Sequence, residues 1–267
     1  MNTYKKEGLL LKATDISLKY DTRQILRDVN FEIFDVKRPN ILQGQVVSLI
    51  GRSGIGKTQL FKILAGLIKP TSGTVTIGLD QQPVKAGEVG VIPQNYILFN
   101  HRTIYNNLRI GLANCGKKVS DKEAEAIIGN YAQKFELQDH LKKFPAQLSG
   151  GQRQRVSIIQ QVLTGNKFIL LDEPFSGLDP VMKDKVDELL LQISNMNEEN
   201  TLIIISHDII NTLALSDTAF ILANEKGKEG ATITEVIDLM DLGFAWNPHI
   251  KADHHFQDLV IDIKSKI

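Results

Sequence analysis

The octapeptide Gly51-Arg52-Ser53-Gly54-Ile55-Gly56-Lys57-Thr58 constrains the fold of this chain most strongly. It follows the apolar run 46–50, and the apolar residues of the next segment, 57–67, recur at a helical period. A glycine-rich loop between a buried strand and a helix presents backbone N–H groups, and the positive end of the helix, to anionic oxygens. The sequence therefore predicts a phosphate-binding loop, rather than a glycine turn that merely links two elements.

Short apolar runs predict a parallel sheet around this loop. They show no alternation of polar and apolar residues, which is typical of strands that helices cover on both faces. The runs comprise residues 46–50, 89–92, 168–171, 202–205 and 219–222. Upstream, residues 14–20 and 28–33 do alternate and predict antiparallel strands with one wetted face, with residues 75–77 as a candidate third strand.

Three stretches lie outside this predicted core. Residues 99–147 predict a helical insert that contains a helix over residues 122–135. Residues 34–42 lengthen the connection before the sheet, and we expect a surface loop there. In the C-terminal tail we expect a helix near residues 233–242 that packs back on the core.

Composition limits the partners of the chain. The 31 Lys and Arg residues balance the 31 Asp and Glu residues, so no global field draws the protein to nucleic acid or to an anionic membrane. The single cysteine, Cys115, cannot form an internal disulfide, which suits a reducing compartment. No apolar run approaches the roughly 18 residues that span a bilayer. We expect a chain that is soluble on its own and has no nucleic-acid partner.

Further motifs restrict the possible families of phosphate-loop proteins to one. After the loop the chain carries, in order, Leu148-Ser149-Gly150-Gly151-Gln152, Leu170-Leu171-Asp172-Glu173-Pro174, Ser176-Gly177-Leu178-Asp179 and Ile205-Ser206-His207-Asp208. With this set the chain resembles the ATPase subunit of ABC transporters. The resemblance implies an α/β P-loop ATPase domain over residues 9–224, with a parallel sheet, an antiparallel β subdomain and an inserted helical subdomain over about residues 99–165. Residues 225–267 form a C-terminal extension.

The resemblance assigns roles around ATP and Mg²⁺. Glu173 corresponds to the catalytic carboxylate that orients or deprotonates the attacking water, and His207 donates to the γ-phosphate. Gln94 contacts Mg²⁺ and the water, and Thr58 and Asp172 are metal ligands with it. The expected nucleotide-binding residues are Tyr20, which stacks on adenine, then Gly51, Arg52, Ser53, Gly54, Ile55, Gly56, Lys57, Thr58, Gln59, Ser149, Gly150, Gly151, Gln152 and Asp179.

Taken singly, several of these residues have ordinary alternatives. Tyr20 could be a half-buried strand tyrosine, Gln94 an unremarkable loop residue, and His207 a structural histidine. Their order relative to the phosphate loop favours the functional interpretation. Two departures from the family pattern stand outside the catalytic set: Gln160 replaces a usual arginine, and Asn211-Thr212 replace a usual glutamate-alanine pair.

The motif that begins at Ser149 implies a second subunit. Its helix presents another anion-binding amino end, which the ATP on the same chain's phosphate loop cannot also occupy. In the family this end faces the nucleotide of a partner, so two chains bind head to tail as a homodimer or as close paralogues. Asp179 belongs to the loop that crosses their interface.

The resemblance also implies membrane partners. Transmembrane permease subunits would dock near residues 94–108, where the apolar stretch Tyr96–Phe99 is expected to be exposed. Through the complex, a solute-binding protein is a further partner, and the chain is expected at the cytoplasmic face of the inner membrane as a peripheral protein.

The expected function is ATP hydrolysis that energises a small-solute importer, and residues 95–112 are most similar to the nitrate, sulfonate and taurine group. Three alternatives remain. One is an ABC exporter or lipid-handling complex. Another is a soluble ABC ATPase acting on DNA or ribosomes, which the single phosphate loop and the lack of a heptad run disfavour. The third is a small-molecule kinase, which the motif at Ser149 disfavours.

Overall fold

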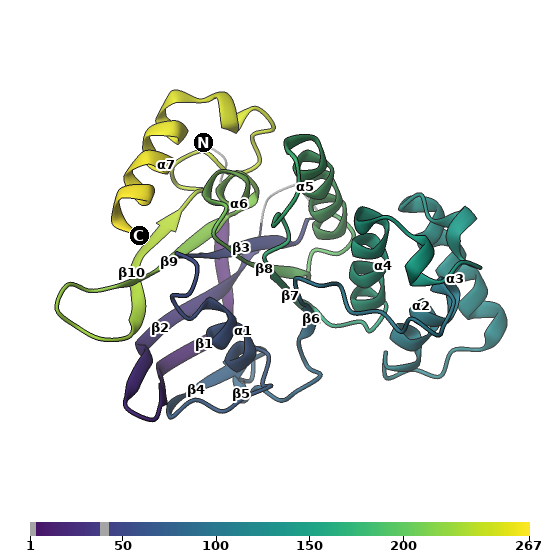
Figure 1. The fold of residues 1–267 in the computed structure, drawn as a ribbon, viewed down its shortest axis with the longest axis horizontal. Coiled ribbons are helices and arrows are strands. Elements are labelled where there is room, and N and C mark those ends of the chain that lie inside the picture. Colours follow the sequence, from purple (N-terminus) through teal and green to yellow (C-terminus); the bar gives the residue numbers. More distant parts are fainter. Residues whose placement is uncertain (1–3, 38–42) are drawn as a thin grey trace.

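A run of parallel strands holds the phosphate loop at its carboxyl edge (Figure 1). The computed structural model describes residues 4–37 and 43–267, in which ten strands form one sheet with the order β5-β4-β1-β2-β10-β9-β3-β8-β7-β6. The mutually parallel strands are β6 (Gly90–Ile92), β7 (Phe168–Asp172), β8 (Thr201–Ser206), β3 (Gln45–Ile50) and β9 (Thr218–Asn224). The predicted α/β fold with a parallel sheet is therefore confirmed.

Helices cover both faces of these strands. Helix α1 (Lys57–Leu64) packs with Leu49 and Ile205, whereas α5 (Pro180–Ser194) packs with Leu171 and Ile204. Since neighbouring strand residues point to opposite faces, each helix meets alternate residues of the same strands. Helix α1 ends three residues before the predicted end, because Gly66 adopts a left-handed conformation with φ 68°.

The antiparallel strands form one end of the sheet. Strands β1 (Lys5–Tyr20) and β2 (Arg23–Lys37) form a long hairpin, β4 (Ser72–Ile77) pairs with β1, and β5 (Gln82–Pro83) pairs with β4. The surface loop expected over residues 34–42 is wrong for its first part. Residues 34–37 continue β2, because their backbone groups pair with residues 5–9 of β1. Residues 38–42 lie outside the described residues.

The helical insert lies to one side of the sheet, at the right of Figure 1. It contains α2 (Ile104–Ala113), α3 (Asp121–Lys134), the 3₁₀ turns η1 (Gln138–His140) and η2 (Pro145–Gln147), and α4 (Gly150–Val162). Helices α2 and α4 pack closely: the buried Gln160 side-chain amide donates to the Asn107 carbonyl at 2.9 Å. A neutral glutamine fits at this position because its partner is an uncharged backbone oxygen.

The helix predicted near residues 233–242 is wrong. This stretch forms β10 (Ala231–Asp238), which pairs antiparallel with β9 and meets β2 at Ala231. Its Ile and Val residues recur at a spacing that also fits a helix, but the β-branched side chains and the open edge of β9 favour a strand. The C-terminal helix is instead α7 (His254–Lys266), which Asp253 caps.

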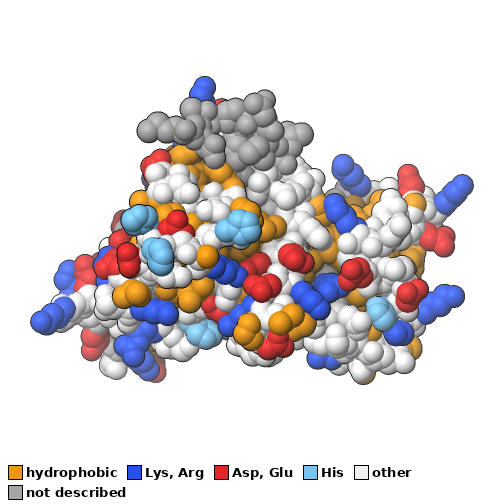
Figure 2. All heavy atoms as spheres, turned by 90° about the horizontal axis from the view of Figure 1, so that it is seen from above, with side chains coloured by type: hydrophobic (Ala, Val, Ile, Leu, Met, Phe, Trp, Pro, Cys, Tyr) orange, Lys and Arg blue, Asp and Glu red, His pale blue; other side chains and the backbone are white. Residues whose placement is uncertain are grey.

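The C-terminal segment packs on the central strands through a third hydrophobic cluster. Ile250 of η3 (Ile250–Ala252), Phe256 of α7 and Ile209 of α6 (Ile209–Leu215) belong to this cluster. Figure 2, which looks onto this side of the molecule, shows basic and acidic side chains interspersed over the surface. Among the described residues, no helix is both long enough and apolar enough to cross a membrane.

Candidate functional site

A cavity of about 530 Å³ lies where the phosphate loop meets the ends of β1, β7 and β8. The carboxyl ends of parallel strands are the usual ligand position in open α/β folds. The lining residues are Tyr20, Arg23, Ile25, Ser53, Gly54, Gly56, Lys57, Thr58, Gln59, Gln94, Glu173, Ser176 and His207. The cavity thus brings together predicted residues that lie far apart in the sequence. It adds Arg23 and Ile25, which belong to no motif, and Ser176, which belongs to a motif but was given no role.

The phosphate loop has the backbone that a cradle for anions requires. Gly54 and Gly56 have φ angles of 79° and 114°, which side chains with a Cβ rarely adopt. A Cβ at Gly56 would also stand 3.0 Å from Ile25. Within the described chain, no side chain caps the amino end of α1, in contrast to α4 and α5. No described side chain therefore competes with an anionic ligand for the N–H groups at this end of the helix.

Lys57 supplies the positive charge at the floor of the cavity. Its ammonium donates to the carbonyls of Gly51 at 2.8 Å and Arg52 at 3.0 Å, and lies 3.3 Å from the Glu173 carboxylate. The side chain is almost fully buried, so the charge acts where water screens it little. An anion in the cradle would meet a preplaced cation.

Glu173 is the centre of a tight polar cluster. Its Oε2 lies 2.7 Å from Nδ1 of His207 and accepts from the Ser206 hydroxyl at 3.1 Å and the His207 backbone N–H at 3.2 Å. Its backbone has φ 51°, a left-handed conformation that is uncommon outside glycine. A side chain held on both sides in this way is fixed in orientation. Ser206 was missed as a contributor, although it stands next to His207 in the sequence.

Asp172 provides a carboxylate suited to a metal ion. It ends β7, lies buried, and accepts a hydrogen bond from Thr58. Burial raises its pKa, and the negative charge of Glu173 adds to the effect. Within the described residues its buried Oδ1 has no hydrogen-bond partner. A hard divalent cation would satisfy this oxygen together with the Thr58 hydroxyl.

Gln94 and Tyr20 lie at the rim. The Gln94 amide donates to the Ser176 hydroxyl at 2.9 Å, and the Tyr20 hydroxyl donates to Gln59 at 3.0 Å. Half of the Tyr20 side chain is exposed. Its aromatic ring therefore has a free surface on which a planar base can stack.

The residues of the Ser149 motif and Asp179 do not line this cavity. Ser149 caps α4 and forms a capping box with Gln152, while Asp179 caps α5. Both are amino ends of helices, and α4 lies to the side of the sheet with the helical insert (Figure 1). Within one chain, Ser149, Gly150, Gly151, Gln152 and Asp179 are therefore separate from the loop that would hold a phosphate.

The exposure expected for the stretch Tyr96–Phe99 is wrong for Leu98. Leu98 is only 8% exposed and belongs to the core of the helical side, whereas Ile97 is 72% and Phe99 48% exposed. The segment is held in place by the buried Asn107, whose amide bonds the backbone of Phe99. Within this stretch, Ile97 and Phe99 are the exposed residues that can offer apolar surface to a partner.

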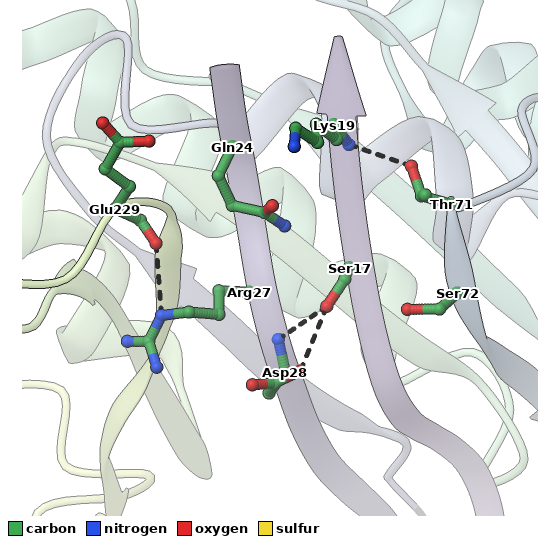
Figure 3. A pocket seen from close by; sticks show the side chains of 8 residues that line it. All are labelled: Ser17, Lys19, Gln24, Arg27, Asp28, Thr71, Ser72 and Glu229. Atoms are coloured by element: carbon green, nitrogen blue, oxygen red, sulfur yellow. Dashed lines mark hydrogen bonds between the residues drawn. The ribbon is translucent and has the colours of Figure 1, made fainter. Parts of the chain in front are cut away.

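A second cavity, of about 390 Å³, lies on the antiparallel end of the sheet (Figure 3). Ser17 bonds Asp28, the backbone N–H of Lys19 donates to Thr71, and Arg27 donates to the carbonyl of Glu229. Arg27 also pairs with Glu225. These bonds join β1, β2 and the turn before β10, so the cavity is best explained as a structural junction.

Comparison with known proteins agrees with this geometry. The structure of cbiO1 from Clostridium perfringens, part of the ABC transporter complex cbiONQ, superposes with a TM-score of 0.73 at 21% identity, covering 97% of this chain and 100% of that one. The bicarbonate transport ATP-binding protein CmpC of Synechococcus elongatus is 37% identical over 196 residues, and the spermidine/putrescine import ATP-binding protein PotA of Fusobacterium nucleatum 33% over 233.

These alignments cover 73% and 85% of this chain, but only 29% and 58% of the two relatives. The chain thus spans less than a third of the length of CmpC and somewhat over half of the length of PotA. A family profile described as ABC transporter matches residues 37–176, which contain the phosphate loop, Gln94, the Ser149 motif and Glu173. The chain belongs to the ABC transporter family.

Proposed function

We propose that this chain is the ATP-hydrolysing subunit of a membrane transporter. The observation that carries the proposal is the convergence of the phosphate loop, Lys57, Glu173 and His207 on one cavity. We assign the β- and γ-phosphates to the loop and Lys57, and the adenine to Tyr20. Mg²⁺, held by Thr58 and Asp172 with Gln94 nearby, would neutralise charge on the phosphates.

The residues of the cavity have complementary tasks in this proposal. Lys57 exchanges its carbonyl partners for phosphate oxygens when nucleotide enters. Glu173, held by Ser206 and His207, accepts hydrogen bonding from the water and orients it toward the γ-phosphate. His207 donates to the γ-phosphate. Because His207 also contacts Glu173, it links the carboxylate to the nucleotide.

The exposed amino ends at Ser149 and Asp179 support a dimer in this proposal. Each would approach ATP bound on the phosphate loop of a second copy, so two chains enclose two nucleotides. The antiparallel end of the sheet and the helical insert then belong to one ATPase domain over residues 9–224, with residues 225–267 as an extension.

The transport assignment rests on the relatives. CmpC and PotA are named for bicarbonate transport and spermidine/putrescine import, which favours a small-solute importer over an exporter. Permease subunits are proposed to dock on the exposed Ile97 and Phe99, which lie close after Gln94 in the sequence. This contact would hold the chain at the cytoplasmic face of a membrane.

The test is phosphate release from Mg-ATP by the full-length chain, together with nucleotide affinity from equilibrium dialysis. We expect ATP-dependent turnover in the wild type and loss of nucleotide binding in Lys57→Ala. Lys122→Ala, which changes an exposed lysine of α3, is the matched control and should retain both. Absence of ATP binding by the folded wild type would contradict the proposal.

A further inference from the structure

A hydrogen-bonded chain leads from the C-terminal segment to Glu173. It begins at Lys251, whose ammonium donates to the side-chain carbonyl of Asn211 at 2.7 Å. Lys251 stands in η3, and Ile250 beside it is buried against Ile209 of α6. Hydrophobic packing thus fixes the backbone that carries the ammonium.

The chain continues through Asn211 into the loop of the histidine. The Asn211 side-chain amide donates to both carboxylate oxygens of Asp208, at 3.0 and 2.9 Å. The backbone N–H of Asp208 donates to the Ser206 hydroxyl at 3.0 Å, and this hydroxyl donates to Glu173 at 3.1 Å. Each link is a hydrogen bond of ordinary length, so the path is continuous.

Lys251 also joins two helices that begin at functional loops. Its ammonium contacts Asp187 at 2.6 Å and Asp184 at 3.2 Å, both on α5. Helix α5 begins at Asp179, and α6 begins at Asp208 beside His207. A second lysine, Lys183 on α5, pairs with Asp208 at 2.7 Å. The loops of Asp179 and His207 are therefore held in a fixed relation by Lys251 and Lys183.

The environment of Asp187 indicates that its contact with Lys251 fixes the arrangement of the two segments rather than adding stability. Its side chain is 12% exposed, and within the described residues its buried Oδ1 has no hydrogen-bond partner. An ion pair with a buried carboxylate seldom adds much net stability, because the cost of desolvation offsets the attraction, but it can specify a unique arrangement.

We propose that Lys251 is a positioning residue for ATP hydrolysis. Through Asn211 and Asp208 it holds the loop of Ser206 and His207 against Glu173, and through Asp187 it ties this loop to the helix that follows Asp179. The inference rests on the proposed function. It gives the C-terminal extension a part in the ATPase cycle. Asn211 suits this path because a neutral amide can both donate to Asp208 and accept from Lys251.

The kinetic test compares Lys251→Met with Lys266→Met in the full-length chain. Lys266 is a matched control, because it is also an ion-paired lysine of the C-terminal segment, with Glu235 as its partner. We expect Lys251→Met to lower kcat about tenfold with KM for ATP within about twofold, since no phosphate contact changes. Lys266→Met should match the wild type, and Lys251→Arg should recover most of the rate.

Amide hydrogen exchange in nucleotide-free protein gives a readout independent of turnover. The amides of Asp208 and Asn211 should exchange faster in Lys251→Met than in the wild type, and Lys266→Met should not change them. Asn211→Ala, which breaks the path but leaves the Lys251–Asp187 pair, should reproduce the loss of kcat.

Two outcomes separate the inference from the proposed function. If the wild type hydrolyses ATP and Lys251→Met or Asn211→Ala retains its kcat, Lys251 has no positioning role while the ATPase assignment stands. If the folded wild type neither binds nor hydrolyses ATP, the proposed function itself is wrong. If Lys251→Met does not fold, the kcat of Asn211→Ala decides the question, because this variant leaves the ion pairs of Lys251 intact.

Discussion

In the proposed site, Glu173 accepts the Ser206 hydrogen bond and accepts a proton from the attacking water, and a single substitution can separate these two roles. Glu173→Gln keeps a side-chain oxygen that can accept from Ser206, but the neutral amide cannot take the proton of a water. We expect ATP binding to persist and hydrolysis to fall by about 10²–10⁴-fold. Steady-state phosphate release and equilibrium nucleotide binding measure the two effects. A rate within about threefold of the wild type, under roughly 1 kcal/mol in the barrier, would remove Glu173 from this role.

Glu136→Gln is the control for this experiment. Glu136 shares the left-handed backbone of Glu173, with φ 57°, and likewise pairs with a basic side chain, Arg155 at 3.0 Å. It does not line the cavity of the phosphate loop. Its substitution tests whether loss of a paired glutamate on a strained backbone alone reduces turnover.

Residues that follow parallel strands could be predicted as neighbours from the sequence. Lys57, Glu173 and His207 come after β3, β7 and β8, which lie side by side in the sheet, so their loops meet at one edge. Lys251 could not be placed in this way. It meets Asp187 across 64 residues of sequence through a C-terminal segment whose course depends on tertiary packing.

At the scale of the element, the contribution of the contact between α5 and the C-terminal segment to the free energy of unfolding depends on pH. Burial raises the pKa of Asp187 from 3.8 to about 6, and the bond from Lys251 opposes this only in part. Between these two values the unfolded chain has released the proton and the folded chain retains it. The carboxyl therefore stabilises the fold at low pH, and this contribution is lost as pH rises through about 6.

Asp187→Asn removes this titration at nearly constant shape. We expect the free energy of unfolding of the wild type, relative to Asp187→Asn, to decrease between about pH 4 and pH 7. Urea denaturation at several pH values measures it. Asp184→Asn is the control, because it removes a more exposed partner of Lys251 and leaves Asp187 in place. Burial is the main cause of the raised pKa of Asp187 and the charge of Asp184 only adds to it, so the wild-type trend should remain, somewhat reduced. A pH-independent difference between wild type and Asp187→Asn would contradict the raised pKa.

Elements were harder to predict where local patterns fit two structures. In residues 231–238, Ile233, Val236 and Ile237 match a helical spacing, and only pairing with β9 decides for a strand. Leu98 likewise cannot be distinguished from Ile97 and Phe99 by hydrophobicity. Its burial follows from the turn that Asn107 fixes at Phe99. In both cases hydrogen bonds between separate segments, which hydrophobicity alone does not reveal, determined the outcome.

At the scale of the whole molecule, the two amino ends that carry Ser149 and Asp179 need a partner if they are to contact nucleotide. In the cavity of one chain, the phosphate loop already supplies the anion-binding backbone. A head-to-tail dimer makes each nucleotide site from the loop of one copy and the Ser149 motif of the other. Consider one substitution in the phosphate loop and one in the Ser149 motif. This arrangement predicts that the number of damaged nucleotide sites depends on whether the two substitutions lie on the same chain or on different chains of the dimer.

The test uses dimers purified through two different tags, in a Glu173→Gln background that retains ATP. When one chain carries Lys57→Ala and the other Ser149→Arg, both lesions fall in the same composite site and the second site is intact. When both lesions are on one chain, each site is damaged once. We expect retained ATP in the first dimer and almost none in the second, measured with labelled nucleotide. Because Ser149 also caps α4, circular dichroism must show that Ser149→Arg remains folded. Equal retention in the two dimers would exclude composite sites, since only sharing between chains makes the distribution of the lesions matter.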